Sequence, residues 1–204
     1  MSRLSFFLPI GLLAVLLSCQ ESVFFCIMPD SVQLRPGDVV FRRGSGLLSQ
    51  AVMRADGKGI YTHTGIVVDS CGELMIVHAV PGEPDYVGDP DRVKMERPEQ
   101  FFCSDRAVCG EVRRLQDSVS AARAAQVALW ICRKGTLFDH TYDLHDTTSM
   151  YCTELVVYSY SRAGFHLQAR PRLTPFASSL VKCDSIFMPS DLMEAEQLRL
   201  LVKF

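Results

Sequence analysis

The sequence predicts an α+β domain in which a small antiparallel sheet packs against helices on one side. Two observations carry this prediction. Residues 61–68 and 73–80 are rich in β-branched and apolar residues and are joined by the turn-forming run 69–72, a pattern typical of a β-hairpin. Residues 117–134 have the apolar spacing and the end signals of a long helix.

The composition is that of a folded globular protein rather than a disordered or fibrous one. Of the 204 residues, 48% are hydrophobic and 22% are charged. The length favours a single domain with a sizeable core. The 21 basic and 23 acidic residues give a net charge of -2, so no excess of positive charge supports binding to nucleic acid.

The first 18 residues differ from the rest of the chain and have the pattern of a secretory signal peptide. Arg3 is the only charged residue before Glu21, and residues 4–17 are apolar except for Ser5. As a helix this stretch rises about 21 Å, short of a bilayer core of about 30 Å, so a transmembrane span is disfavoured. A short buried helix is the alternative interpretation.

The apolar stretch ends in LLSC at positions 16–19, which resembles a bacterial lipobox. In signals of this kind the cysteine is lipidated and becomes the new N-terminus. The resemblance implies that Cys19 carries the lipid and holds the protein at a membrane of the bacterial cell envelope, facing outward. We therefore interpret residues 1–18 as a lipoprotein signal peptide, 19–33 as a tether and 34–204 as one folded domain.

The elements of the domain are identified from patterning and turn residues. The stretch 81–91 contains three prolines and two glycines and is expected to be a surface loop. In order, we expect a strand at 39–41, a short helix within 44–59, the hairpin at 61–80, strands at 92–95 and 107–115, helices at 117–134 and 149–163, a largely irregular stretch at 171–189, a short helix from 189 and a final strand at 198–204.

The long helix that follows Asp117 has signals at both ends. Asp117, Ser118 or Ser120 can cap its start, and Gly135 is expected to end the helix. Val127, Trp130 and Ile131 form an apolar face, which we expect to pack against the sheet.

Two histidines fall in the two strands of the predicted hairpin. If 69–72 is a symmetric connection, Val68 faces Glu73, and His63 then lies directly opposite His78 with Cβ atoms about 5 Å apart. Two imidazoles this close allow one to act as a base while the other holds it in place. A bulged turn would instead point them to opposite faces. A lone histidine is more often a partly buried residue than a catalyst, so the joint placement is what indicates function.

Cys152 lies where the helix at 149–163 is expected to begin. Backbone N–H groups at a helix N-terminus have no partner within the helix, and together with the helix dipole they favour a thiolate. The same groups can stabilise an oxyanion on a carbonyl under attack. With a histidine beside it, Cys152 forms the nucleophile–base pair of a thiol enzyme. A buried structural thiol is the alternative interpretation.

Several short stretches of the domain form a set whose order is informative. They are LRPGDVVF at 34–41, THTGIVV at 62–68, YD at 142–143, YCTELVV at 151–157 and PSDL at 189–192. With the histidine before the cysteine, this set resembles the permuted, papain-like branch of the NlpC-type cysteine hydrolases, the YiiX-like group. The resemblance covers nearly all of residues 34–195.

The resemblance implies a papain-like fold with a cysteine nucleophile at the N-terminus of a helix that packs on the sheet. At the matching positions, Cys152 is the nucleophile, His63 the base and His78 the residue that orients the base. Many YiiX-like proteins have glutamate near the third position. The histidine in MIVHAV is closer to the lecithin:retinol acyltransferase-like relatives, which leaves the substrate open. Glu73 and Glu83 are the alternative orienting residues.

The function we expect is that of an exported thiol hydrolase that cleaves an amide through an acyl–Cys152 intermediate and needs no cofactor. The family analogy points to a peptide substrate, such as a peptide of the cell wall. One alternative is hydrolysis or transfer of acyl groups on lipids, which the membrane tether and His78 favour. The other is a non-catalytic surface lipoprotein, which could bind zinc through Cys152, His63 and His78.

The remaining candidates for chemistry are weaker. His140 and His145 lie near Asp143 and Asp146 and could hold a metal ion, but a solvated loop is the favoured interpretation. Seven cysteines remain when Cys19 is assigned to the lipid, so at least one stays free if all the others pair. The alternative is that most are small buried hydrophobic residues. They are Cys26, Cys71, Cys103, Cys109, Cys132, Cys152 and Cys183.

Overall fold

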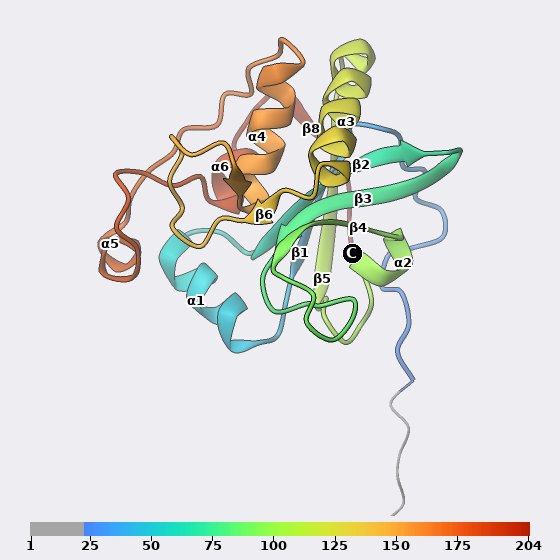
Figure 1. The fold of residues 1–204 in the computed structure, drawn as a ribbon. Coiled ribbons are helices and arrows are strands. Elements are labelled where there is room, and N and C mark those ends of the chain that lie inside the picture. The colour runs from blue at the N-terminus through green and yellow to red at the C-terminus, as the bar shows by residue number, and fades with distance from the viewer. Residues whose placement is uncertain (1–22) are drawn as a thin grey trace, which may run out of the picture.

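The centre of the fold is one eight-stranded sheet, which Figure 1 shows together with its helices. The computed structural model describes residues 23–204. The strands follow the order β7-β6-β4-β3-β2-β1-β5-β8 across the sheet. Their bounds are β1 Val39–Arg43, β2 His63–Ser70, β3 Glu73–Val80, β4 Arg92–Glu96, β5 Cys109–Leu115, β6 Leu137–Phe138, β7 Ser149–Met150 and β8 Leu198–Lys203.

Most of the helices lie on one side of this sheet. Their bounds are α1 Leu47–Asp56, α2 Pro98–Phe101, α3 Ser118–Arg133, α4 Cys152–Arg162, α5 Pro175–Leu180 and α6 Pro189–Met193. The predicted α+β class, with a mainly antiparallel sheet packed against helices, is confirmed. The structure differs from the prediction in several elements. The short elements α2, β6 and β7 were not predicted; β6 and β7 pair in parallel, and α2 lies on the opposite face from α3 and α4 (Figure 1). The stretch 171–189, expected to be largely irregular, contains the helix α5.

The hairpin between β2 and β3 turns through two residues, Cys71 and Gly72. Their φ angles are 60° and 86°, the left-handed conformation that a tight two-residue hairpin turn requires. Val68 therefore pairs with Met75, and the expected pairing of Val68 with Glu73 is wrong by two positions. Because side chains alternate with a period of two, a shift of two keeps every side chain on its predicted face.

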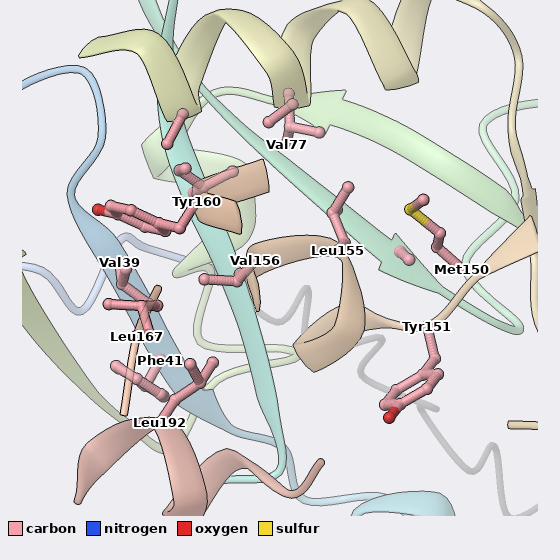
Figure 2. Close-up of a cluster of buried hydrophobic side chains, with 14 of the residues drawn as sticks. Val39, Phe41, Val77, Met150, Tyr151, Leu155, Val156, Tyr160, Leu167 and Leu192 are labelled. Carbon is pink, nitrogen blue, oxygen red and sulfur yellow. The ribbon is translucent and has the colours of Figure 1, made fainter. Parts of the chain in front are cut away.

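The larger core lies between the sheet and the helices α3 and α4. Figure 2 shows Leu155 and Val156 of α4 packed towards Val39 and Val77 of the sheet, and all four side chains are fully buried. Burial of this kind removes apolar surface from water, at roughly 25 cal/mol for each Å². This face supplies the main hydrophobic stabilisation of the domain.

The apolar face of α3 is narrower than predicted. Ile131 is buried and Val127 packs against the core, but Trp130 is 59% exposed, so the expectation that it faces the sheet is wrong. The inward face is otherwise made of alanines, which let the helix approach the sheet closely and leave no room for an indole. Trp130 instead lies beside Lys134, whose ammonium is 5.4 Å from the ring centre.

A second, smaller apolar cluster lies on the other face of the sheet. It contains Val67, Phe101 and Phe102, and the chain before β1 packs against it through residues 26–34. The N–H of Ile27 donates to the carbonyl oxygen of Phe102 at 2.9 Å. In Figure 1 this blue segment passes beside α2. Part of the stretch interpreted as a tether therefore contacts the domain.

The PSDL motif forms the start of α6 and is held by a buried charged group. The Asp56 carboxylate accepts the N–H of Ser190 at 3.1 Å, and Arg172 bridges Asp56 and Asp191. This contact joins the end of α1 to α6, so the motif has a structural role. Within residues 23–204, no helix has the length and apolar character needed to cross a bilayer.

Candidate active site

Cys152 is the first residue of α4 and follows β7 after one residue, Tyr151. The helix begins later than position 149 because Ser149 and Met150 pair with β6. Tyr151 is the N-cap, and its N–H donates to the side chain of Glu154 at 3.3 Å. Burial raises the pKa of Glu154 to about 8, so this carboxyl adds little negative charge beside Cys152 at neutral pH. The positive end of the helix dipole is thus retained at Cys152.

The strands β2 and β3 separate beside Cys152. Their pairing runs from the hairpin turn to Ile66 and Val77, so the residues of β2 that precede Ile66 do not pair with β3. The backbone N–H of Thr64 can therefore hydrogen-bond the Cys152 sulfur. Burial raises the pKa of the Cys152 thiol, and hydrogen bonds from Thr153 and Thr64 oppose this effect in part. The sulfur is therefore a protonated thiol at rest near neutral pH.

His63 and His78 meet on the face of the sheet that carries α2. Nε2 of His63 lies 2.9 Å from Nδ1 of His78. The expectation that they lie directly opposite is wrong, because the register differs by two and makes them diagonal neighbours. Gly65 leaves room for this approach: a Cβ at this position would lie only 3.2 Å from the Cβ of His78 and 3.0 Å from the carbonyl oxygen of Val77.

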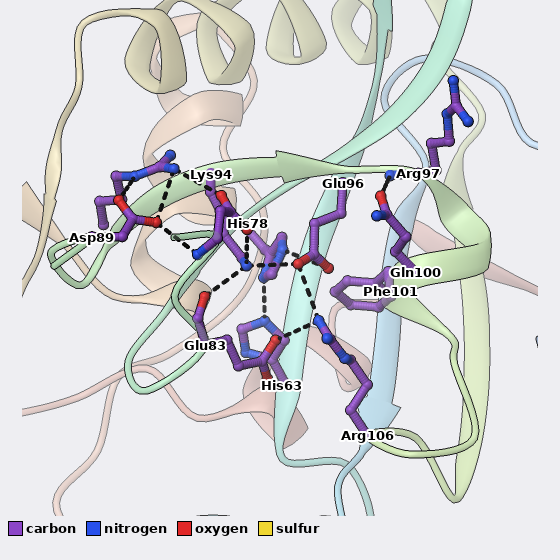
Figure 3. A network of polar contacts seen from close by, with 12 residues as sticks. His63, His78, Glu83, Asp89, Lys94, Glu96, Arg97, Gln100, Phe101 and Arg106 are labelled. Carbon is purple, nitrogen blue, oxygen red and sulfur yellow. Dashed lines mark hydrogen bonds and ion pairs between the residues drawn. The ribbon is translucent and has the colours of Figure 1, made fainter. Parts of the chain in front are cut away.

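Glu96 of β4 continues the row behind His78 (Figure 3) and was missed in the sequence. Nε2 of His78 lies 3.3 Å from Oε2 of Glu96, a contact less well aligned than a standard hydrogen bond. Among the described residues, neither atom has a hydrogen-bond partner. Oε1 of Glu96 is 2.7 Å from Lys94 Nζ and 3.1 Å from Arg106 Nη1. Lys94 pairs with His78, and Glu96 lies two residues further along β4, on the same face of the sheet. A prediction of the β3–β4 register would therefore have placed Glu96 near His78.

The charges around these groups determine which ring nitrogens carry hydrogen. Burial acts to raise the pKa of Glu96, but its contacts with His78 and Lys94 outweigh burial and hold that pKa below its usual value. An ionised carboxylate only accepts, so Nε2 of His78 carries the hydrogen and its Nδ1 accepts from Nε2 of His63. Burial and the nearby Arg42 charge lower the pKa of His63. His63 is therefore neutral, with its lone pair on Nδ1.

Phe101 of α2 covers the two imidazoles. Its ring centre is 5.6 Å from that of His63 and 5.2 Å from that of His78. The guanidinium of Arg42 lies 4.7 Å from the Phe101 ring centre and donates to the Phe101 carbonyl oxygen at 3.0 Å. This packing restricts the rotation of both rings and excludes water, and burial lowers the pKa of His78.

The two alternative orienting glutamates pair with arginines rather than with histidine. Glu73 lies at the exposed end of the hairpin, 2.7 Å from Arg97. Glu83 pairs with Arg42 and Arg106 beside the cavity.

The histidines proposed as alternative metal ligands lie apart from this row. His140 is exposed and lies 3.2 Å from Asp91, and His145 is exposed in the following loop. Within residues 23–204, no three His, Cys, Asp or Glu side chains are grouped as ligands for a metal ion.

Cys152 and His63 line one cavity of about 560 Å³. The wall on the α1 and α5 side is apolar, and Leu48 and Leu180 stand at its rim, 52% and 58% exposed. The opposite wall is charged. Its charged residues are Arg42, Glu83, Asp105 and Arg106.

Tyr142 also lines this cavity and adopts a left-handed backbone conformation, with φ of 57°. Its ring centre is 5.2 Å from that of Tyr151. Burial raises the pKa of Tyr142 to about 12. Its hydroxyl is therefore protonated and able to donate a hydrogen bond within the cavity.

The predicted lipidation residue Cys19 and the signal-like residues 1–18 lie outside the described residues.

Comparison with known proteins reveals a family and a similar fold. The sequence profile of the permuted papain-like amidase family YaeF/YiiX, C92, matches residues 33–202. A solved structure described as the metalloprotein yiiX from Escherichia coli O157:H7 superposes with a TM-score of 0.64 at 18% identity, covering 85% of this chain and 99% of that chain. At this identity the superposition establishes the fold alone. No curated protein sequence matches significantly.

The profile match extends over all of the sheet except the last residue of β8 and includes the histidines and the cysteine described above. The chain belongs to the permuted papain-like amidases of the C92 family.

Proposed function

We propose that this protein is an exported, lipid-anchored cysteine hydrolase that cleaves amide bonds in peptides, with Cys152 as nucleophile, His63 as base and His78 as the residue that orients the base. One observation carries the proposal: Cys152 begins a helix and shares a cavity with His63, whose far nitrogen is bound by His78 at 2.9 Å. The membership of an amidase family supports the same chemistry.

The proposed reaction starts from a neutral thiol and a neutral imidazole. Nδ1 of His63 removes the proton as the Cys152 sulfur attacks the substrate carbonyl carbon. The imidazolium then gives this proton to the leaving amine as the C–N bond breaks, which leaves a thioester on Cys152. Water, deprotonated by His63, attacks the thioester; the acid leaves and the proton returns to the sulfur.

Glu96 stabilises the charge that forms during the first step. When His63 becomes positive, its Nε2–H still donates to His78, and the Nε2–H of His78 points to the carboxylate of Glu96. The buried negative charge favours the imidazolium electrostatically without a second proton transfer. Glu96 acts through His78 and is a positioning residue.

Backbone groups at the start of α4 support the developing oxyanion. The N–H of Cys152 belongs to the first turn, which has no intrahelical acceptor for it. The Tyr142 hydroxyl is a second donor in the same cavity. Donors fixed before reaction stabilise the transition state at little reorganisation cost.

A thiol-directed acylating probe tests the nucleophile. Mass measurement is expected to show one adduct at Cys152 in the full chain and none at this site after Cys152→Ala. Cys71→Ala, which removes an exposed thiol, is the matched control and is expected to keep the Cys152 adduct. Equal labelling of the parent and of Cys152→Ala contradicts the proposal.

Lipid anchoring is tested separately at Cys19. Cell fractionation and mass spectrometry of the N-terminal peptide are expected to show an acylated Cys19 in the membrane fraction of a bacterial host. Cys19→Ala is expected to release the protein from that fraction. An unmodified, uncleaved N-terminus in the wild type contradicts this part of the proposal and leaves the catalytic part standing.

Acyl transfer or hydrolysis on lipids is the second candidate, and the apolar wall of the cavity favours it. Leu48 and Val52 of α1 line this wall together with Leu180 and Val181 at the end of α5, and an apolar lining suits an acyl chain. Turnover of short peptide amides is to be compared with that of acyl lipids. Faster turnover of lipids, reduced by Leu48→Ser, replaces the peptide assignment.

The residues of this site do not fit a zinc ion. His63 and His78 direct one nitrogen each at the other, and Arg42 and Lys94 place positive charge beside them. A divalent cation would be repelled by these charges and would have to break the contact between the imidazoles. The zinc-binding alternative therefore has no ligand set here, and no step of the proposed reaction uses a metal.

A further inference from the structure

Two cysteines outside the cavity face each other where the N-terminal segment meets the domain. Cys26 and Cys103 form an isolated antiparallel bridge. The N–H of Ile27 donates to the carbonyl oxygen of Phe102 at 2.9 Å, and the N–H of Ser104 donates to that of Phe25 at 2.8 Å. These bonds flank the cysteines instead of joining them, so Cys26 and Cys103 are a non-hydrogen-bonded pair.

The backbone geometry of such a pair suits a disulfide. Non-hydrogen-bonded antiparallel pairs bring their Cα atoms to about 4.5 Å, and disulfides span Cα distances of about 4.4 to 6.8 Å. Cys103 is among the groups that raise the pKa of Cys26, after burial, as expected of neighbouring sulfur atoms. Both side chains are half-buried.

We propose that Cys26 and Cys103 form a disulfide in an oxidising compartment and join the N-terminal segment covalently to the domain. The oxidant is a small-molecule or protein disulfide. One thiolate attacks it to give a mixed disulfide, and the other thiolate displaces the leaving thiol, so two cysteine thiols are oxidised while one external disulfide is reduced to two thiols. In the cell this rests on the export in the proposed function; the capacity to form the bond does not.

The bond would connect the membrane tether to one wall of the candidate active site. Cys103 lies two residues after Phe101, which covers both imidazoles, and the Cys103 carbonyl oxygen accepts the N–H of Arg106 at 3.0 Å. The Arg106 side chain reaches Glu96 at 3.1 Å. A tether fixed at Cys26 would therefore be joined directly to the segment that packs against His63, and force on the lipid anchor would pass through the cross-link to Cys103 instead of through residues 27–38 to β1.

The assignment leaves an odd number of described cysteines. With Cys26 and Cys103 paired, five described cysteines remain, and Cys152 among them has to stay reduced to act as a nucleophile. Cys71 lies exposed at the tip of the hairpin, far along the chain from both partners, and serves as a control.

The test is oxidation of the full chain with oxidised glutathione, in the Cys152→Ala variant so that the nucleophile does not take part. Free thiols are blocked with N-ethylmaleimide before digestion without reductant. Chymotrypsin cleaves after the phenylalanines that precede Cys26 and Cys103, which separates Cys26 from Cys19. Mass spectrometry is expected to recover one cross-linked peptide pair that contains Cys26 and Cys103.

Thermal unfolding gives an independent readout that does not depend on activity. The oxidised protein is expected to unfold about 5 to 15 °C above the reduced protein, because the bond closes a long loop in the unfolded chain. Cys26→Ser and Cys103→Ser are each expected to abolish this difference, whereas Cys71→Ser retains it. Recovery of both cysteines as maleimide adducts, a cross-link from Cys103 to another cysteine, or an unchanged difference in Cys26→Ser overturns the proposal.

Discussion

The two faces of the central sheet differ in chemistry although they share the same strands. In β1, Val39 and Phe41 point towards α3 and α4, while Arg42 points to the other face and reaches Phe101. Towards α3 and α4 the sheet buries mainly apolar side chains, and the ion pair of Glu111 and Arg113 in β5 is the exception. The opposite face buries ionisable groups next to a smaller apolar cluster, among them His63, His78, Lys94 and Glu96.

This difference separates stability from chemistry. Apolar burial stabilises the fold through area and tolerates changes that keep the volume. Buried ionisable groups cost desolvation energy and persist only where each has a partner. A face of this kind adds little to the free energy of unfolding although many of its polar contacts must be satisfied. This is what we expect of a site that is retained for function.

The largest expected effect on the polar face comes from His63→Ala. We expect the rate of amide hydrolysis to fall about 10³-fold, because the general base is removed. The free energy of unfolding should change far less. Steady-state kinetics together with urea unfolding measure both quantities. Activity within a factor of ten of the wild type would remove His63 from the proposed mechanism.

On the apolar face, Ile131→Ala should have the opposite profile. Ile131 is 1% exposed in the core, so the cavity left by truncation is expected to lower the free energy of unfolding by about 2 to 5 kcal/mol. Activity per folded molecule should stay near that of the wild type. Trp130→Ala on the exposed side of the same helix is the matched control and should change stability little. Comparable losses from both variants would contradict the described packing of α3.

Glu96→Gln tests whether the carboxylate behind His78 supports catalysis or only the fold. We expect kcat/KM to fall about 10²-fold through misplacement of the imidazoles. A structural role alone would not move the pH profile, whereas loss of the negative charge should shift the acidic limb of kcat/KM to lower pH. Glu73→Gln at the exposed hairpin end is the control. An unshifted limb in Glu96→Gln would reduce Glu96 to a packing residue.

The smallest effect expected is in the pH dependence of the wild type. Burial and the Arg42 charge lower the pKa of His63, so the acidic limb of kcat/KM should lie below the ordinary imidazole value of 6.5. Below pH 6.5, His63 and His78 bind protons in the unfolded chain but stay neutral in the folded one, because burial lowers their pKa values. The free energy of unfolding should therefore fall as the pH falls below 6.5. Titration of both quantities checks this sign. An acidic limb above 6.5 would contradict the lowered pKa of His63.

Local patterns in the sequence were sufficient for much of this arrangement. The face shared by His63 and His78 follows from alternation, which a register error of two does not disturb. The position of Cys152 at a helix start follows from turn and helix signals close to it in the chain. The family motifs predicted the fold, which the profile match supports.

The features that were missed depend on contacts far apart in the chain. Glu96 reaches His78 only through the β3–β4 register, and the long loop between those strands does not fix that register from sequence. The exposure of Trp130 depends on how closely an alanine-lined helix approaches the sheet. The bridge between Cys26 and Cys103 joins two segments that are separated in the sequence by the strands β1 to β4.

The single residue between β7 and α4 makes the nucleophile the stationary part of the site. Met150 accepts a backbone hydrogen bond from Asp139 at 3.2 Å, and the Tyr151 hydroxyl accepts one from Phe187 at 2.9 Å, so the two residues that precede Cys152 are anchored. Displacement of the Cys152 backbone would have to break the pairing at the sheet edge. We therefore expect that differences in substrate size are accommodated by the opposing wall at α1 and α5, and that substitutions which change selectivity occur there.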